Sequence, residues 1–218
     1  MTDTFQAARR NMVLSQINTD NVTDRRLQSA METVPREQFV PHTKRAAAYS
    51  SDNVDLGGGR VLLSPRTLGK MIQACEIEPD DEVLVVGSST GYAAAVMAHM
   101  ATVVVALESD EALVTGATNL LLDLGIDNAA VFSGALADGH PKGAPYDVIF
   151  VDGAVYEVPE VLKGQLKEGG RLVALEKKGP LCQATLYLKT GTVTTGRSLF
   201  DAAGDILPGF EKAEEFTF

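Results

Sequence analysis

The chain has 218 residues, enough for one large domain that buries about 70% of the surface of its unfolded chain. Its 45% hydrophobic and 22% charged residues are typical of a soluble globular protein. The net charge of −10 repels phosphate backbones and anionic lipid, which disfavours general binding to nucleic acid or to a membrane surface.

The first third of the chain has helical character without strand alternation. Residues 5–17 place apolar side chains at helical spacing. A second helix follows Asp24, which can cap it, and ends at Pro35. The run of glycines at 57–59 predicts a break in regular structure. Ser64 then caps a third helix with proline in its first turn.

From residue 80 onward, strands alternate with helices. We expect strands at 82–86, 103–107, 129–132, 148–151 and 172–175, and helices at 91–100, 111–124 and 158–166. Nearly continuous apolar strands with intervening helices predict an α/β fold with a mainly parallel sheet that is buried on both faces. Residues 184–188 and 197–200 read as strands of a C-terminal antiparallel hairpin. We expect one domain, 1–218, with an N-terminal helical extension (1–56) and a core (57–218).

A glycine turn follows the first expected strand of the core. Gly87 and Gly91 bracket a tight turn into a helix N-terminus, whose free N–H groups can face a ligand. A P-loop needs lysine where Tyr92 stands, and the dinucleotide fingerprint needs glycines of which only the first is present. A tight turn without a ligand explains these glycines equally well.

The second strand ends in an acidic residue. Glu108 lies 21 residues after Gly87, close to the spacing at which a carboxylate binds a ribose diol. The alternative is a solvated acid at a strand end, and the spacing alone does not choose between the two.

Cysteine and histidine usage predicts no metal site. Cys75 and Cys182 are the two cysteines, and the three histidines lie far apart. Cys75 lies in a helical apolar pattern, as a core residue does. This usage fits a reducing compartment, and the first six residues contain no apolar segment typical of a secretory signal. We therefore expect a cytoplasmic protein.

Several motifs resemble those of one known family. They are AMETVPREQFVP at 30–41, Ala48-Tyr49 with Gly57, Gly59 and Pro65, GYAAA at 91–95, APYD at 144–147 and QLKEGGRLV at 165–173. With them the chain resembles the protein-L-isoaspartate (D-aspartate) O-methyltransferases from about residue 12 to residue 218.

The resemblance implies a Rossmann-like methyltransferase that moves a methyl group from S-adenosylmethionine to the α-carboxyl group of L-isoaspartyl residues. S-adenosylhomocysteine would be the product, isoaspartyl-containing proteins or peptides the partners, and a monomer the expected state. It also implies a substrate loop with Ser64 and Arg60 as the catalytic candidates. The cofactor-binding candidates are Gly87, Ser88, Ser89, Gly91, Tyr92, Glu108, Ser109, Ala135 and Asp152.

The chain departs from the family pattern where the chemistry is expected. Val85 replaces an acid, Ser89 a loop glycine, and Ala135 the aspartate that meets the adenine amino group, with Asp138 three residues further on. An unpaired buried partner costs about 1–3 kcal/mol, so two lost contacts would weaken cofactor binding by about two decades. The hydroxyls of residues 88–90 can bind the cofactor's carboxylate instead.

Two charged residues remain open to two interpretations. Asp152 stands where the family has threonine, and it either faces the pocket or bonds its own loop beside Gly153. Arg60 stands where the family has glutamine, and it either binds the acceptor carboxylate bidentately or points to solvent.

Two other functions stay open at this point. One is a methyltransferase of the same fold that acts on another acceptor, in view of Leu63 and Asp152. The other is a binding protein that has kept the fold without the cofactor.

Overall fold

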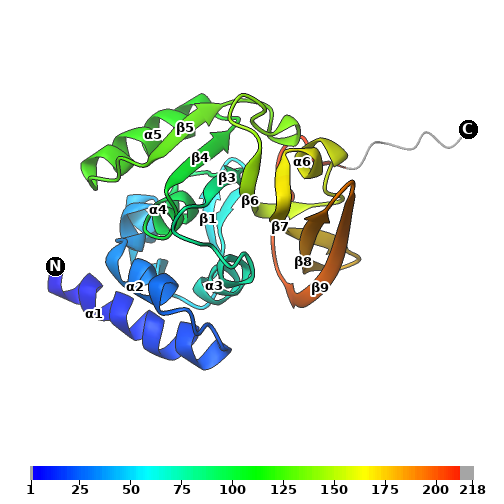
Figure 1. The fold of residues 1–218 in the computed structure, drawn as a ribbon. Helices are drawn as coiled ribbons and strands as arrows, with labels where there is room; N and C mark the ends of the chain where they lie inside the picture. Colours follow the sequence, from blue (N-terminus) through cyan, green and yellow to red (C-terminus); the bar gives the residue numbers. More distant parts are fainter. Residues whose placement is uncertain (1, 212–218) are drawn as a thin grey trace, which may run out of the picture.

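The structure, a computed structural model, describes residues 2–211. Its centre is a seven-stranded sheet in the order β5-β4-β3-β6-β7-β8-β9 (Figure 1). The five strands from β5 to β7 run parallel, and β8 and β9 are antiparallel to their neighbours. The expected α/β class and the antiparallel C-terminal hairpin are confirmed.

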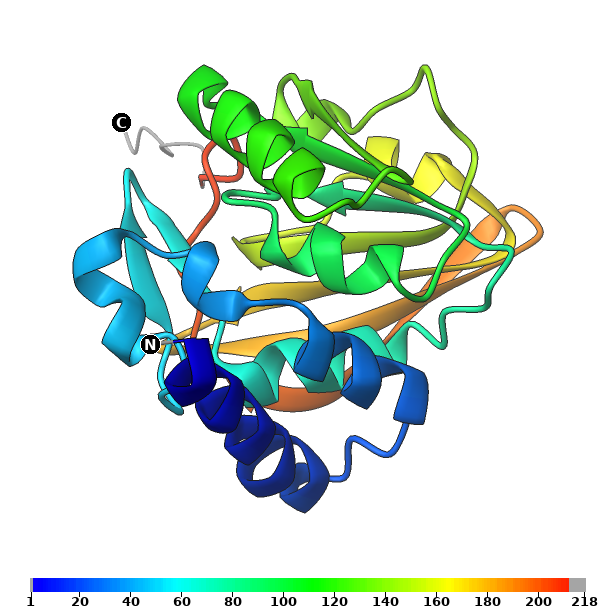
Figure 2. The ribbon, with the colours of Figure 1, turned by 90° about the vertical axis from the view of Figure 1, so that its left-hand side faces the viewer.

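The N-terminal helices form a layer on one face of the sheet (Figure 2). They are α1 (Thr2–Met12), α2 (Arg25–Thr33) and α3 (Pro65–Ala74), with a π-helical turn at Val13–Ile17 and 3-10 turns at Asn18–Asp20, Arg36–Gln38 and His42–Ala47. The side chain of Asp24 caps α2 by accepting from the N–H groups of Arg26 and Leu27, and Ser64 caps α3 by accepting from that of Thr67. Both expected caps are confirmed.

Two short strands lie where the sequence predicts only a break. β1 (Val54–Gly57) and β2 (Arg60–Leu62) form an antiparallel pair. Gly57, Gly58 and Gly59 turn the chain between them with φ values of 87°, 59° and 72°, a region that favours glycine. The glycines therefore mark a hairpin turn, and strands of four and three residues are too short to show an alternation.

The core elements follow the expected order. They are β3 (Glu82–Val86), α4 (Tyr92–Ala98), β4 (Val103–Glu108), α5 (Glu111–Asp123), β5 (Ala129–Ser133), a 3-10 turn (Leu136–Asp138), β6 (Tyr146–Val155), α6 (Glu160–Gly164), β7 (Leu166–Lys178), β8 (Leu181–Thr190) and β9 (Val193–Ala202). β6 and β7 extend beyond the expected 148–151 and 172–175, and β7 begins where the end of a helix was expected. The β6–β7 register shifts between Phe150 and Ala154.

Alternating strand residues divide the core into two clusters. Val83, Val85, Val148 and Phe150 belong to the cluster that contains the N-terminal helices. The other cluster contains the alternate strand residues together with α6 and the C-terminal residues Leu207 and Phe210. Side chains of one strand thus point alternately to the two faces, as expected of a sheet covered on both sides.

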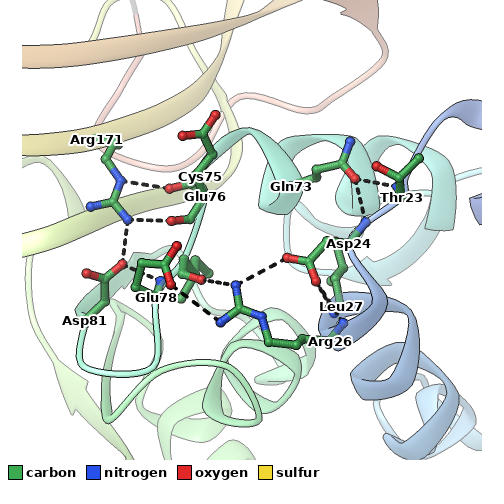
Figure 3. A network of polar contacts seen from close by, with 11 residues as sticks. Thr23, Asp24, Arg26, Leu27, Gln73, Cys75, Glu76, Glu78, Asp81 and Arg171 are labelled. Carbon is green, nitrogen blue, oxygen red and sulfur yellow. Dashed lines mark hydrogen bonds and ion pairs between the residues drawn. The ribbon is translucent and has the colours of Figure 1, made fainter.

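A polar network fastens the helical layer to the amino ends of the strands (Figure 3). Arg171 of β7 donates to the carbonyl oxygens of Cys75 and Glu76, each at 2.8 Å, and to Asp81 Oδ2 at 2.5 Å. Arg26 of α2 donates to the Ile77 carbonyl oxygen at 2.7 Å. These contacts hold the end of the sheet opposite the glycine turn. Among the helices of residues 2–211, none is long and apolar enough to cross a bilayer.

Candidate functional site

The candidate site lies where the strand order reverses. From β3 the chain moves outward to β4 and β5, and then returns to the other side of β3 with β6 and β7. In parallel α/β sheets, ligands bind outside the carboxyl ends of the strands at such a point. The turn after β3, the end of β4 and the end of β6 therefore meet at one edge.

The turn between β3 and α4 is held in an unusual backbone conformation. Gly87, Ser89 and Gly91 have φ values of 76°, 52° and 93°. The N–H groups of Gly87 and Ser88 both donate to the Leu107 carbonyl oxygen, at 2.9 and 3.0 Å, which ties the turn to β4. Ser89 is the one non-glycine of the three, and a residue with a Cβ adopts this conformation at a cost.

Glu108 is fully buried and its carboxylate has no free acceptor position. Its two oxygens accept from Arg60 Nη2 at 2.5 Å, Arg60 Nε at 3.1 Å and the backbone N–H groups of Ser89, Ser109 and Asp110 at 2.9, 2.7 and 3.0 Å. Ser109 Oγ is a sixth donor, at 3.3 Å. A carboxylate offers about four lone-pair sites, so these six donors occupy it. Burial alone would raise the pKa of Glu108, but the hydrogen bonds and charge of Arg60, with the backbone donors, lower it below its usual value. The solvated alternative for Glu108 is wrong.

Arg60 reaches Glu108 from the second strand of the β1–β2 hairpin. It is 3% exposed, and its Nη2 also donates to Ser109 Oγ at 3.1 Å. The solvent-facing alternative is therefore wrong as well. The structure brings Arg60 to the place where a ribose would be bound; its catalytic role stays a prediction.

Asp152 and Arg36 add two further buried charges. Asp152 Oδ1 has no hydrogen-bond partner among residues 2–211. Burial raises the pKa of Asp152 to about 7, Arg36 opposes this rise, and Glu108 adds to it. Arg36 lies over the ring of Tyr92, 4.8 Å from its centroid, and burial lowers the pKa of its guanidinium.

The C-terminal segment closes the edge of the site. The Ala154 N–H donates to the Asp205 carbonyl oxygen at 2.9 Å, and the Leu207 N–H donates to the Ala154 carbonyl oxygen at 2.8 Å. The Leu207 side chain packs so closely that a Cβ at Gly87 or Gly153 would lie 2.7 Å from it. Only glycine fits at these two positions while Leu207 stays in place.

The remaining predicted residues are Ser64, Ala135 and Ser109, and of these Ser109 contacts both Arg60 and Glu108. Ser64 is occupied as the cap of α3: its Oγ accepts from the Thr67 N–H at 3.3 Å and lies 3.0 Å from Thr67 Oγ1. Ala135 and Ser109 are exposed. The site residues that sequence reasoning missed are Arg36 and Leu207. Arg36 lies within the family motif at 30–41, which is the signal that could have identified it, whereas nothing in the pattern singles out Leu207.

The hydrogen-bonding groups of this edge suit a polar nucleoside with an amino-acid end. Four atoms near this edge, in addition to Asp152 Oδ1, are buried without a partner among the described residues: Arg36 Nη1, Ser88 Oγ, Ser89 Oγ and Tyr92 Oη. They offer donors beside the glycine turn, and Glu108 offers a carboxylate once Arg60 leaves it. No group of three or more metal-binding side chains occurs within residues 2–211.

The chain is similar to proteins of one family. A family model described as protein-L-isoaspartate(D-aspartate) O-methyltransferase (PCMT) matches residues 7–190. Identity is 40% over 169 residues with protein-L-isoaspartate O-methyltransferase 1 of Rhodopseudomonas palustris, covering 78% of this chain and 69% of the relative. It is 36% over 189 residues with the protein-L-isoaspartate O-methyltransferase of Opitutus terrae, covering 87% and 80%.

Solved structures agree with the family model. A structure named protein-L-isoaspartate O-methyltransferase matches with a TM-score of 0.80 and 27% identity, over 92% of this chain and 66% of that one. A PCMT from Plasmodium falciparum, solved in complex with S-adenosyl-L-homocysteine, matches with a TM-score of 0.77 and 19% identity, over 91% and 97%, which shows a shared fold.

Proposed function

The chain belongs to the protein-L-isoaspartate(D-aspartate) O-methyltransferase family, and from this membership we propose how its residues carry out the reaction. It is a methyltransferase that uses S-adenosylmethionine, and it transfers a methyl group to the α-carboxyl group of L-isoaspartyl residues. The resemblance found in the sequence is confirmed. A different acceptor and a cofactor-free binding protein are not favoured by these relatives.

The observation that carries the residue assignment is the buried Glu108 carboxylate beside the glycine turn. We assign to it the two ribose hydroxyls of the cofactor, because a carboxylate accepts from both and its charge strengthens each bond. Its acceptor positions are filled while Arg60 is bound. Cofactor binding therefore requires the Arg60 side chain to withdraw from Glu108.

The reaction needs alignment more than acid–base catalysis. When bound, S-adenosylmethionine supplies an electrophilic methyl group on a sulfonium, and a carboxylate is already a nucleophile at neutral pH. The residues of the site then serve to orient the two groups and to exclude water. The segment around Leu207 supports the second role, because it already covers Gly87 and Gly153.

Calorimetric titration with S-adenosylmethionine tests the cofactor assignment. Glu108→Ala is expected to weaken binding by about 1.5–3 kcal/mol, the worth of charge-assisted hydrogen bonds. Glu157→Gln, at an exposed position, is the control. Unchanged affinity in a folded Glu108→Ala variant would remove Glu108 from the cofactor site, and no binding to the wild-type chain would contradict the proposed function.

We further propose a cytoplasmic, single-domain monomer that acts on isoaspartyl proteins or peptides. Two buried free cysteines suit a reducing compartment. The net charge of −10 makes nucleic acid an unfavourable partner.

A further inference from the structure

The unpartnered buried atoms at the sheet edge form an unusual group. They are Arg36 Nη1, Ser88 Oγ, Ser89 Oγ, Tyr92 Oη and Asp152 Oδ1, and none has a hydrogen-bond partner within the described chain. Ser88 and Ser89 follow β3 after Gly87, and Val86 of β3 pairs with Val151, just before Asp152. Buried polar groups are nearly always paired in native proteins, so such a group points to a ligand that pairs them.

Arg36 presents one free edge of a fixed guanidinium. Its Nε and Nη2 donate to the carbonyl oxygens of Ala48 and Leu63, both at 2.6 Å, and its plane is packed over Tyr92. The side chain is fully buried, and no carboxylate in residues 2–211 forms an ion pair with it. Nη1 is thus a cationic donor held in place without an anion.

Asp152 lies on the same side of the sheet as Arg36. Val148 and Phe150 face the N-terminal helices, and Asp152 continues their alternation along β6. Asp152 is 6% exposed, and the charges of Asp152 and Arg36 influence each other's pKa. The two side chains thus lie on one side of the sheet and form no ion pair, and a small group between them could contact both.

The chemistry of such a group follows from the two free atoms. Nη1 donates most strongly to an anionic oxygen, and the Asp152 oxygen accepts an N–H. An α-amino-acid unit carries a carboxylate and a nitrogen on the same carbon. The hydroxyls of Ser88 and Ser89 can donate to the same carboxylate.

We propose that Arg36 and Asp152 together bind an α-amino-acid unit, with its carboxylate on the guanidinium and its nitrogen on the Asp152 carboxyl group. This inference rests on the proposed function, under which two ligands carry the unit. One is the amino-acid end of the cofactor, and the other is the isoaspartyl acceptor, with its free α-carboxylate and neighbouring amide N–H.

The test measures binding to the full chain by calorimetry with three probes. S-adenosylhomocysteine carries the amino-acid unit, 5′-methylthioadenosine lacks it, and an isoaspartyl peptide carries it without the nucleoside. The variants are Asp152→Asn and Arg36→Lys, with Glu157→Gln as the exposed control, and thermal unfolding is recorded for each because Arg36 also holds two carbonyl groups.

If the cofactor provides the unit, Asp152→Asn weakens S-adenosylhomocysteine about tenfold or more and leaves 5′-methylthioadenosine unchanged. If the isoaspartyl acceptor provides the amino-acid unit, Asp152→Asn weakens binding of the isoaspartyl peptide and leaves both nucleosides unchanged. Equal losses for both nucleosides, or no loss for any probe, would overturn the inference. If the wild-type chain binds neither nucleoside, the proposed function fails. The isoaspartyl peptide and a fourth probe, free methionine, then test the inference by themselves, and binding of neither of these two would overturn it.

Discussion

The Arg60–Glu108 pair is the feature of the site on which the proposed cofactor binding depends most. Both side chains are almost fully buried, and the guanidinium occupies the carboxylate that we assign to the ribose. A bound cofactor must therefore replace two charge-assisted hydrogen bonds. The pair satisfies both buried charges, and under this assignment we expect it to lower the affinity for the cofactor.

Arg60→Gln is therefore expected to strengthen S-adenosylmethionine binding by about tenfold, since the competing charge is removed. The measurement is calorimetric titration. Arg66→Gln is a matched control, because Arg66 follows closely in the chain but is 59% exposed and pairs with Asp20. Weaker binding by the Arg60 variant would show that Arg60 contacts the cofactor and does not compete with it.

Asp152 makes stability depend on pH. Burial raises the pKa of Asp152 in the folded state to about 7, above the ordinary value of 3.8. Between these two pH values, Asp152 is therefore protonated in the folded state and ionised in the unfolded state. The free energy of unfolding therefore falls as pH rises toward 7. The difference between the two pKa values corresponds to about 4 kcal/mol. Arg36, Glu108 and Tyr92 are the other ionisable groups that face this region.

Asp152→Asn should consequently gain stability relative to wild type as the pH is raised from 5 to 8. Thermal unfolding at several pH values measures the difference. Glu108 contributes little to the change in stability between pH 5 and 8. Because its pKa is lowered in the folded state, the stability that it adds is lost only in more acidic solution. A difference between variant and wild type that is constant from pH 5 to 8 would contradict a buried, neutral Asp152.

At the residue scale, sequence reasoning found Glu108 but not its partner. The spacing from Gly87 identifies a carboxylate at the end of β4, because strand and helix lengths in such units vary little. The contact with Arg60 joins residues 48 positions apart, across a hairpin too short to be recognised. Local pattern carries no information on such a pairing.

At the element scale, the C-terminal segment acts as a cover over the edge of the sheet. Leu207 lies against Gly87 and Gly153, from two adjacent strands. A short segment after β9 has no periodicity to predict its path. The sequence predicts the longer elements better: β3 and α5 are predicted nearly to their ends, since their apolar patterns are local signals.

A double-mutant cycle tests this cover. Gly153→Ala is expected to cost about 1–3 kcal/mol of stability, because the new Cβ would lie 2.7 Å from Leu207. In a Leu207→Ala background, that cost should largely disappear. Gly164→Ala serves as the control, since a Cβ added there would have nothing within 4 Å and the backbone conformation is permissive. Equal costs of Gly153→Ala in both backgrounds would show that Leu207 does not occupy this space in solution.

At the scale of the whole molecule, strand order brings the site together. Glu108, Asp152 and the glycine turn come from three strands that adjoin only because β6 returns beside β3. The alternation of elements in the sequence predicts a parallel sheet, but the order of its strands is a property of tertiary packing. The glycine turn and two of the residues that depart from the family pattern, Ser89 and Asp152, thus meet at one edge.

Transfer of a labelled methyl group from S-adenosylmethionine to a peptide tests the central claim most directly. Two peptides of the same sequence are compared, one with an L-isoaspartyl residue and one with an ordinary L-aspartyl residue. We predict label on the isoaspartyl peptide alone, in a form that alkali releases as expected of a carboxyl methyl ester. A folded chain that binds S-adenosylmethionine but labels neither peptide, or labels both equally, would contradict the account.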